Sequence, residues 1–183
     1  MPSMAVVSAM QKCIRRAMEK EAMEFAVELL HTSKAFCSMC CNRLEVISHE
    51  DIDSTSQPHI VPFVATSCEQ AKRFHELPNP AKSRLIVGNA IRLMCRAVKS
   101  REGDHFQASI GLRSILEEFT PVIPDWAVDM HTPRGKKMGR GLEHFLSEGC
   151  QLKPPASPDR YECEARRMWE LKAKAIASGT FPE

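Results

Sequence analysis

The sequence predicts an all-α fold, a single multi-helix bundle. Apolar residues recur at steps of three and four through most of the chain, which is the period of a helix with one buried face. No segment sustains the apolar–polar alternation of a strand, and no Asn-Gly or Asp-Gly pair marks a hairpin. Because 183 residues suffice for one domain with its own core, we expect a single domain over residues 1–183.

The first helices are predicted over residues 19–34 and 35–48, because each has apolar residues along one face. In the first of them, these residues are Ala22, Phe25, Ala26, Leu29 and Leu30. In the second, they are Phe36, Met39, Cys40, Leu44 and Ile47. A third helix is predicted over 59–77, with Pro62 near its start, where proline is tolerated.

The next helix, over 79–100, is apolar on more than one side, which indicates a central and well-buried position. A helix over 104–119 follows, with Asp104 as the expected N-cap. Residues 120–126 contain two prolines and are predicted to form a loop.

The C-terminal part is predicted to be less regular. Residues 132–149 begin glycine-rich and basic and end as a short helix around Leu142 and Phe145. A proline-rich connector over 151–160 precedes a last helix over 159–178, which adds to the helical region of residues 1–153. This helix has one apolar stripe and is polar elsewhere, so we expect it on the surface of the bundle or against a partner.

Composition limits the function classes. The net charge of +2 provides no global field for nucleic acid, so such binding would need a local patch. No run approaches the roughly 20 apolar residues that span a bilayer, and the N-terminus lacks the order of a signal peptide. We therefore expect a cytoplasmic protein without membrane association, whose eight cysteines are buried free thiols.

The stretch "RLEVISHEDID", residues 43–53, gathers several polar side chains. His49, Glu50, Asp51 and, further on, His59 could serve a metal-dependent enzyme. Neighbouring helical residues point in different directions, so a helix end with a polar turn is the simpler interpretation. We expect a structural polar turn in which Glu50 or Asp51 bonds to nearby backbone or pairs with a basic side chain such as Arg43. This turn is predicted to comprise Arg43, Ser48, Glu50 and Asp51.

Other signatures of chemistry are weak. Cys37, Cys40 and Cys41 offer half of a zinc site, but no second C-x-x-C pair exists, and buried thiols on a helix face are the preferred interpretation. The Walker pattern of nucleotide-binding loops and the G-x-S-x-G elbow are absent. We assign no catalytic residue, no metal site and no cofactor.

Two basic groups are candidate nucleic-acid contacts. Arg134, Lys136, Lys137 and Arg140 alternate with glycines that let cations and backbone amides approach phosphate together. Arg96 and Lys99 lie at a predicted helix end. The alternatives are a solvated basic loop and cations that favour the helix dipole.

Four stretches of the chain carry a resemblance to a known family: "AMQKCIRRAMEKEAMEFAVELL", "NRLEVISHEDID", "GNAIRLMCRAVKS" and "MGRGLEHFLSEGCQLKPP". In this order they resemble the C-terminal region of the replication-associated recombination protein A (RarA/MgsA) family of AAA+ ATPases. The second and third match the family pattern at Arg43, Leu44, Ile47, Ser48, Glu50, Asp51, Ile52, Ala90, Leu93, Lys99 and Ser100. The chain departs from the family in lacking its terminal tyrosines and in extending past its usual end with residues 159–178.

The resemblance implies an all-α domain similar to the clamp-loader collar, here as a stand-alone chain or a fragment without the ATPase module. It further implies a non-enzymatic oligomerisation domain, tetrameric in that family, that serves DNA replication, recombination or repair. The partners that it implies are further copies of the chain and, in addition, DNA or a replication ATPase. The alternative is a DNA-binding accessory protein that uses the basic glycine-rich loop.

Overall fold

The computed structural model describes residues 3–77, 81–116, 120–155 and 161–180. Every regular element in these ranges is a helix, which confirms the all-α class. Within them, extended backbone pairs at a single antiparallel bridge, between Ile52 and Lys99. The chain divides into two compact units, Met1–Thr120 and Pro121–Glu183.

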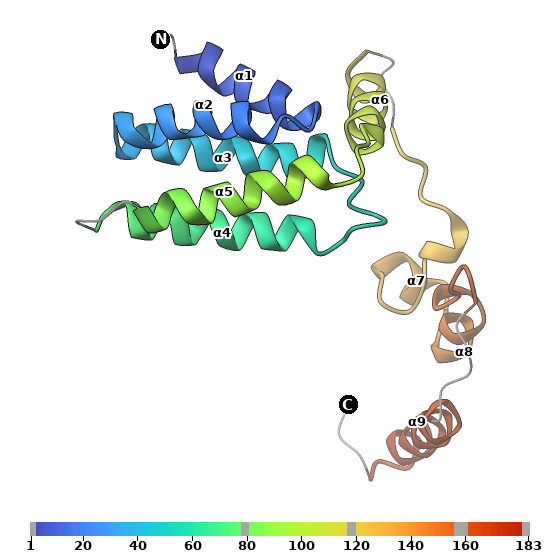
Figure 1. The fold of residues 1–183 in the computed structure, drawn as a ribbon. Helices are drawn as coiled ribbons and strands as arrows, with labels where there is room; N and C mark the ends of the chain where they lie inside the picture. The colour runs from blue at the N-terminus through green and yellow to red at the C-terminus, as the bar shows by residue number, and fades with distance from the viewer. Residues whose placement is uncertain (1–2, 78–80, 117–119, 156–160, 181–183) are drawn as a thin grey trace. The chain divides into compact units, whose positions relative to one another are not determined.

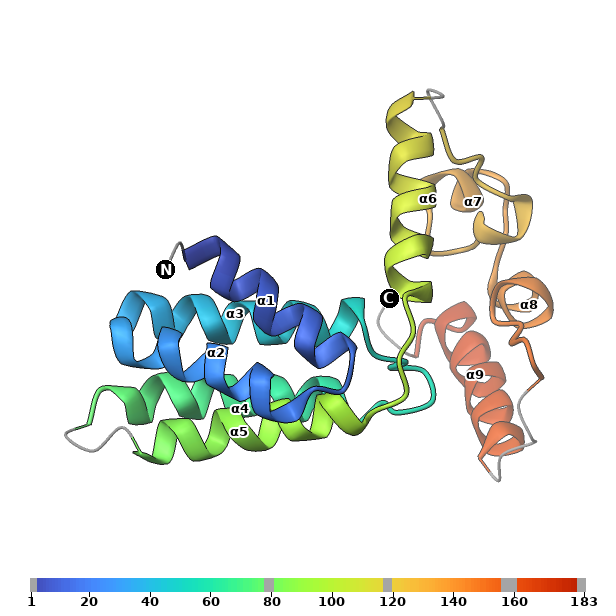
Figure 2. The same cartoon turned by 45° about the horizontal axis from the view of Figure 1, so that its top comes forward.

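The first unit is a helical bundle with one further helix. Figure 1 and Figure 2 show α2 to α5 lying side by side, with α1 packed against α2. A last helix, α6, begins close to the end of α3. The bounds are α1 Ser3–Arg15, α2 Glu19–Thr32, α3 Lys34–Glu50, α4 Ile60–His75, α5 Ala81–Arg96 and α6 Glu102–Leu116.

Local chemistry explains where these helices begin and end. Ser33 separates α2 from α3, and its Oγ accepts a hydrogen bond from the backbone N–H of Phe36 at 3.4 Å, as an N-cap does. α6 begins at Glu102, two residues before the predicted start, because Ser100 Oγ accepts from the Glu102 N–H at 3.1 Å. The prediction that Asp104 is the N-cap was therefore wrong. Asp104 lies in the first turn of α6 and pairs with Arg101.

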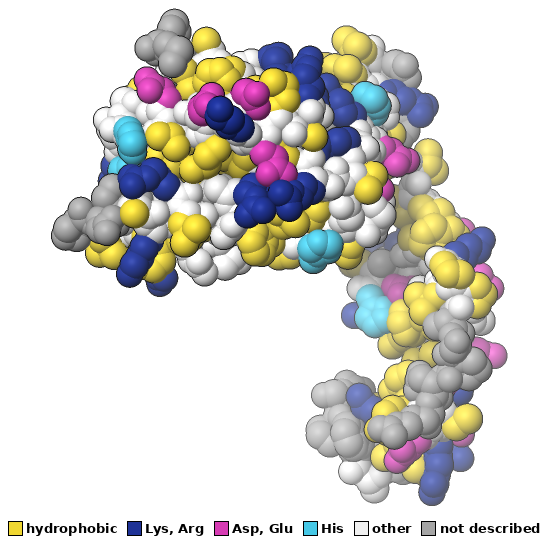
Figure 3. All heavy atoms as spheres, in the orientation of Figure 1, with side chains coloured by type: hydrophobic (Ala, Val, Ile, Leu, Met, Phe, Trp, Pro, Cys, Tyr) yellow, Lys and Arg dark blue, Asp and Glu magenta, His cyan; other side chains and the backbone are white. Residues whose placement is uncertain are grey.

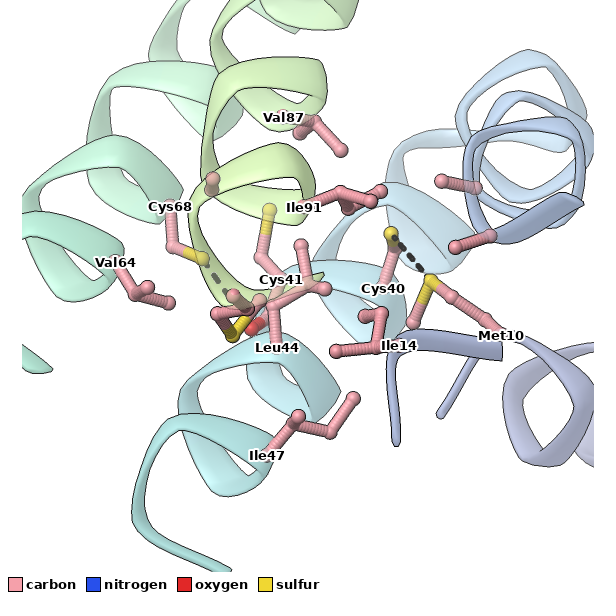
Figure 4. Packing of buried hydrophobic residues seen from close by; sticks show 14 of the residues in the cluster. Met10, Ile14, Cys40, Cys41, Leu44, Ile47, Val64, Cys68, Val87 and Ile91 are labelled. Atoms are coloured by element: carbon pink, nitrogen blue, oxygen red, sulfur yellow. Dashed lines mark hydrogen bonds between the residues drawn. The ribbon is translucent and has the colours of Figure 1, made fainter. Parts of the chain in front are cut away.

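The core of the first unit combines aliphatic side chains with thiols. Figure 4 shows Met10 and Ile14 from α1 meeting Leu44 from α3 and Ile91 from α5. Cys40 Sγ donates to the Met10 sulfur at 3.8 Å. Cysteine here behaves as a small apolar residue, as expected for a free buried thiol. The buried cysteines are Cys37, Cys40, Cys41, Cys68 and Cys95.

Not every cysteine follows the predicted burial. All eight are free thiols, but Cys150 and Cys163 are exposed and Cys13 is only partly buried. The two exposed thiols belong to the second unit, where few side chains are buried. The expectation of burial was wrong for these two because a helical pattern in the sequence does not establish that a second element covers it.

The second unit consists of short elements and one long helix. Its elements are η1 Asp125–Ala127, α7 Pro133–Lys137, α8 Leu142–His144, η2 Phe145–Gly149 and α9 Glu162–Ala177. The turn of η1 lies where a loop was predicted, whereas α8 and η2 form the predicted short helix. The predicted start of the last helix, at 159–160, lies outside the described residues. Over the described ranges, no helix combines the length and apolar character needed to cross a bilayer.

Candidate functional site

Asp51, at the end of α3, is the centre of a polar cluster. Its side chain is buried, with Asp51 only 1% exposed, and its backbone N–H donates to the Ile47 carbonyl at 2.9 Å. Asp51 Oδ2 accepts from Gln11 Nε2 at 3.0 Å and from Arg15 Nη2 at 3.1 Å. Arg15 Nε also lies 2.9 Å from Asp51 Oδ1, as an ion pair whose angle does not suit a hydrogen bond. The buried carboxylate is therefore paired and hydrogen-bonded, which a buried charge requires.

Glu50 extends this cluster to the start of α6. Its Oε2 accepts from Gln11 Nε2 at 2.9 Å, and its Oε1 lies 3.3 Å from both Arg15 Nη2 and Arg101 Nη2. Arg101 also pairs with Asp104. Side chains of α1, the end of α3 and the beginning of α6 are thus joined by one network of charges and hydrogen bonds.

The structure places the residues of the predicted polar turn in different roles. Glu50 and Asp51 pair with Arg15, and not with the suggested Arg43. Arg43 instead donates to Gln11 Oε1 at 3.4 Å, so it contacts the cluster through an intermediate side chain. Ser48 Oγ donates to the Glu45 carbonyl of its own helix at 2.7 Å.

Sequence reasoning missed Gln11 and Arg15. The available signal was their spacing, because residues four apart lie on the same face of a helix. Gln11 is buried and Arg15 half-buried, which is unusual for such polar residues unless they have partners.

Directly after the cluster, two loops pair. The Asp53 N–H donates to the Val98 carbonyl at 3.0 Å, and the Ser100 N–H donates to the Asp51 carbonyl at 3.2 Å. Gln57 bonds to both backbone groups of Val98, through Nε2 at 3.2 Å and Oε1 at 3.1 Å. This pairing holds the exit of α3 against the exit of α5.

Lys99 lies within this pairing and caps α5. Its ammonium donates to the carbonyls of Met94, Cys95 and Ala97, with distances of 3.0 Å to Cys95 and 3.2 Å to Ala97. Burial lowers the pKa of this ammonium group. The ammonium satisfies carbonyls that the end of a helix leaves without partners, which is a structural role.

The side chains of the polar stretch are directed to different partners. Glu50 and Asp51 contact the helix network, whereas Asp53 accepts from the hydroxyls of Thr55 and Ser56, both at 2.6 Å. These bonds, that of Ser56 first, lower the pKa of Asp53 to about 2. His59 precedes α4 and makes no side-chain capping bond there. Among the described residues, no three His, Cys, Asp or Glu side chains are placed to hold a metal together.

The basic candidates for nucleic-acid binding separate into two kinds. Arg140 is turned inward: its Nη1 donates to the carbonyls of Asp125 at 2.7 Å and Val128 at 2.6 Å, and its side chain is 14% exposed. Arg96 donates to Glu19 through Nε at 2.6 Å and Nη2 at 3.2 Å. Together with Lys99, these cations have structural partners. In the glycine-rich loop, Arg134, Lys136 and Lys137 are exposed, whereas Arg96 is exposed but paired with Glu19.

A close backbone contact supports the three exposed cations. Thr132 Oγ1 accepts from the Gly135 N–H at 3.0 Å and caps α7, and Pro133 occupies its first turn. A Cβ on Gly135 would lie 1.8 Å from the Asp129 carbonyl oxygen, so only glycine fits there. Since Arg140 also bonds back to Asp125, α7 is held as part of a defined local structure.

The largest apolar exposure of a single helix in the first unit is on α6, which has no buried residue. Phe106 is 70% exposed and Ile115 77% exposed. At 3.6 residues per turn, the exposed apolar side chains spread over more than half of the helix circumference. They are Phe106, Ile110, Leu112, Ile115 and Leu116. Below, these five residues are called the α6 apolar face.

Comparison with known proteins assigns no function. No protein-family model matches the chain, and a search of curated proteins gives no significant match.

Proposed function

We propose that the chain is a non-enzymatic helical oligomerisation domain that associates through the α6 apolar face. The observation that carries this proposal is a helix of 15 residues, none of them buried, with five large apolar side chains exposed. A helix that is apolar around most of its circumference is normally covered by another element. Such an exposed patch marks an interaction site.

The energies are sufficient for association. Burying the exposed part of each side chain contributes roughly 1–2 kcal/mol, or roughly 10–20 kcal/mol for ten side chains from two copies. Association costs about 4–15 kcal/mol in lost freedom of motion. The two ranges overlap, so burial of the α6 apolar face is of the size needed to offset the cost of association.

A second copy of the chain is the partner that suits this face. In a twofold dimer the same surface meets itself, so two apolar faces match without a further protein. The first turn of α6 is acidic, with Glu102 and Asp104, and its last turn carries Arg113. In an antiparallel pair the acidic turn of one copy would lie near the basic turn of the other, which is a favourable arrangement.

The setting of this function follows from the resemblance to RarA/MgsA-type ATPases. On that basis we propose a role in DNA replication, recombination or repair in the cytoplasm, with a tetramer as the assembled state. A tetramer requires a second interface besides the α6 pair, because one twofold contact closes at two copies.

Light scattering after size-exclusion chromatography, at micromolar protein, tests the proposal. The wild-type chain is expected to have the mass of a dimer or tetramer, and the double variant Ile115→Glu/Leu116→Glu half of that mass, because only the α6 contact is removed. Leu85→Glu is a matched control, because Leu85 is an exposed leucine of α5, and it should retain the wild-type mass. A monomeric wild-type chain would contradict the proposal.

A second candidate function is direct DNA binding by Arg134, Lys136 and Lys137. The observation in its favour is that these three cations are exposed on one well-supported turn. Phosphate contacts make the logarithm of the binding constant fall linearly with the logarithm of salt concentration. Neutralising all three should lower affinity for duplex DNA and reduce that slope by about 3. Neutralising Lys12, Arg16 and Arg73, three exposed cations of the first unit, is the matched control.

A further inference from the structure

A surface groove between α2 and α5 is unused by the proposed self-association. Its volume is about 370 Å³. Its apolar part is formed by Met23 of α2 with Leu85 and Gly88 of α5, and its border includes Lys20, Arg84 and Arg92. In the space-filling view, dark-blue Lys and Arg side chains border yellow apolar ones over this part of the bundle (Figure 3).

Gly88 is the first indication that this groove accommodates something. It lies in the middle of α5, where glycine is the least favourable residue apart from proline. The packing does not require it, because a Cβ at this position would lie 3.5 Å from Met23 Sδ and 3.6 Å from Met23 Cε, at ordinary contact distance. The bundle could therefore hold alanine here, whereas glycine keeps the groove deeper by one methyl group.

Charge is the second indication. Three cations and one carboxylate, that of Glu19, line the groove. Glu19 is shared between two guanidinium groups, since Arg92 Nε lies 3.6 Å and Arg96 Nε 2.6 Å from its oxygens. Arg84 Nη1 contacts His31 Nε2 at 3.2 Å, and an imidazole does not supply the negative charge of a carboxylate. The border of the groove thus has a surplus of positive charge beside an apolar floor.

We propose that this groove binds an acidic segment of a partner protein that inserts one apolar side chain over Gly88. The apolar side chain contacts Met23 and Leu85, and carboxylates on either side of it pair with Arg84 and Arg92. Peptides recognised in this way combine an anchor in an apolar pocket with charges at the border. Nucleic acid fits less well, because none of the described lining residues is aromatic and could stack on a base.

The proposal is tested by fluorescence anisotropy with a short fluorescein-labelled peptide of alternating aspartate and leucine. The wild-type chain should bind it, and an equally charged peptide with serine in place of leucine should bind at least about tenfold more weakly, because the apolar anchor is missing. Gly88→Leu, which fills the floor, should weaken binding of the leucine peptide by a similar factor. Arg84→Glu should weaken it as well, through the loss of a border cation.

Two variants serve as controls. Gly111→Leu introduces the same side chain on α6, where no atom lies within 4 Å of the new Cβ, and it should bind the peptide as the wild type does. Lys137→Glu changes the net charge as a border variant does, but outside the groove. Circular dichroism establishes that each variant is folded.

Equal affinity for the two peptides, or an unchanged affinity in Gly88→Leu, would overturn the proposal. Tighter binding of a single-stranded oligonucleotide that displaces the peptide would overturn it too and would assign the groove to nucleic acid. The groove lies on α2 and α5, outside the α6 apolar face. A monomeric wild-type chain that still binds the peptide would therefore refute self-association and leave the proposal for the groove intact.

Discussion

Arg15 Nε lies 2.9 Å from Oδ1 of the buried Asp51, so a guanidinium of α1 holds the carboxylate that ends α3. The two residues are far apart in the chain, and their pair connects the first helix of the bundle to the point where the backbone leaves α3. Gln11 donates to the same carboxylate at 3.0 Å. This arrangement makes Asp51 a sensitive position for the stability of the first unit.

Asp51→Ala is expected to lower the free energy of unfolding by about 2–4 kcal/mol, because Arg15 and Gln11 lose a buried acceptor. Urea denaturation followed by circular dichroism measures the change. Glu24→Ala is the control: Glu24 is exposed and pairs with Lys20 only at 4.0 Å, so its loss should cost less than about 0.5 kcal/mol. Equal effects of the two substitutions would contradict the assigned role.

The turn around Asp53 predicts an acid-dependent loss of stability. Hydrogen bonds from Ser56 and Thr55 lower the pKa of Asp53 from 3.8 to about 2. Between these two pKa values the Asp53 carboxyl is mostly protonated in the unfolded chain and mostly ionised in the folded chain. The stability that its hydrogen bonds contribute is therefore fully present above about pH 4 and is lost as the pH falls towards about 2. Denaturation across this range should therefore show a shallower pH dependence for Asp53→Asn than for the wild type. If stability depended on pH with the same slope in Asp53→Asn as in the wild type, the assigned role of Asp53 would be wrong.

The cysteine thiols of the two units should react with a thiol reagent at different rates. Cys150 and Cys163 are exposed, whereas burial raises the pKa of Cys40 and raises that of Cys95 to about 11. Because the thiolate is the reacting form, a disulfide reagent at mildly basic pH should modify the exposed pair in a fast phase. Replacing both by serine should remove that phase, and its survival would show that a cysteine of the first unit is accessible. Urea should then expose the remaining thiols.

Gly88→Ala should stabilise the protein. Alanine is favoured over glycine in a helix interior by about 0.5–1 kcal/mol, and the new methyl group would meet Met23 at ordinary contact distance. Thermal unfolding should show a rise in the melting temperature. Gly111→Ala, also within a helix and with no neighbour near its Cβ, provides the reference for the helix effect alone. A loss of stability in Gly88→Ala would mean that the Met23 side chain cannot accommodate the added methyl group.

Gly135→Ala should have the opposite effect on the second unit. Its Cβ would lie 1.8 Å from the Asp129 carbonyl oxygen, so the backbone must shift, at a cost of about 1–3 kcal/mol or more. Amide chemical shifts of residues 125–150 should change throughout that segment. Gly141→Ala, where no atom lies within 4 Å of the Cβ, should affect only its neighbours. Similar spectra for both variants would contradict the close contact.

Much of the fold could be predicted because helical periodicity is a local signal. The predicted helices over 19–34, 35–48 and 59–77 correspond to α2, α3 and α4 within a few residues. The predicted helix over 79–100 ends earlier, at Arg96, because Lys99 bonds to its last carbonyls. Such an ending depends on one side-chain conformation and leaves no periodic trace in the sequence.

The site was harder to predict because its contacts are non-local. The partner of Asp51 is Arg15, on another helix, while the nearby Arg43 contacts Gln11 instead. Arg140 resembled the other cations of its loop, yet its acceptors are the carbonyls of Asp125 and Val128. The exposure of the α6 apolar face could not be predicted, since a sequence pattern does not tell whether a partner helix is present. Replication and tetramer formation, implied by the resemblance, stay predictions.

Lys99 determines how long the connection after α5 can be. Its ammonium reaches back to the carbonyls of Met94, Cys95 and Ala97, while Val98 and Ser100 on either side pair with the backbone after α3. Adding or removing one residue between 96 and 100 would turn this side chain away from the helix and shift the backbone pairing. Insertions and deletions should therefore be rejected in these few residues, although they form a surface connection of the kind where length changes are usually accepted.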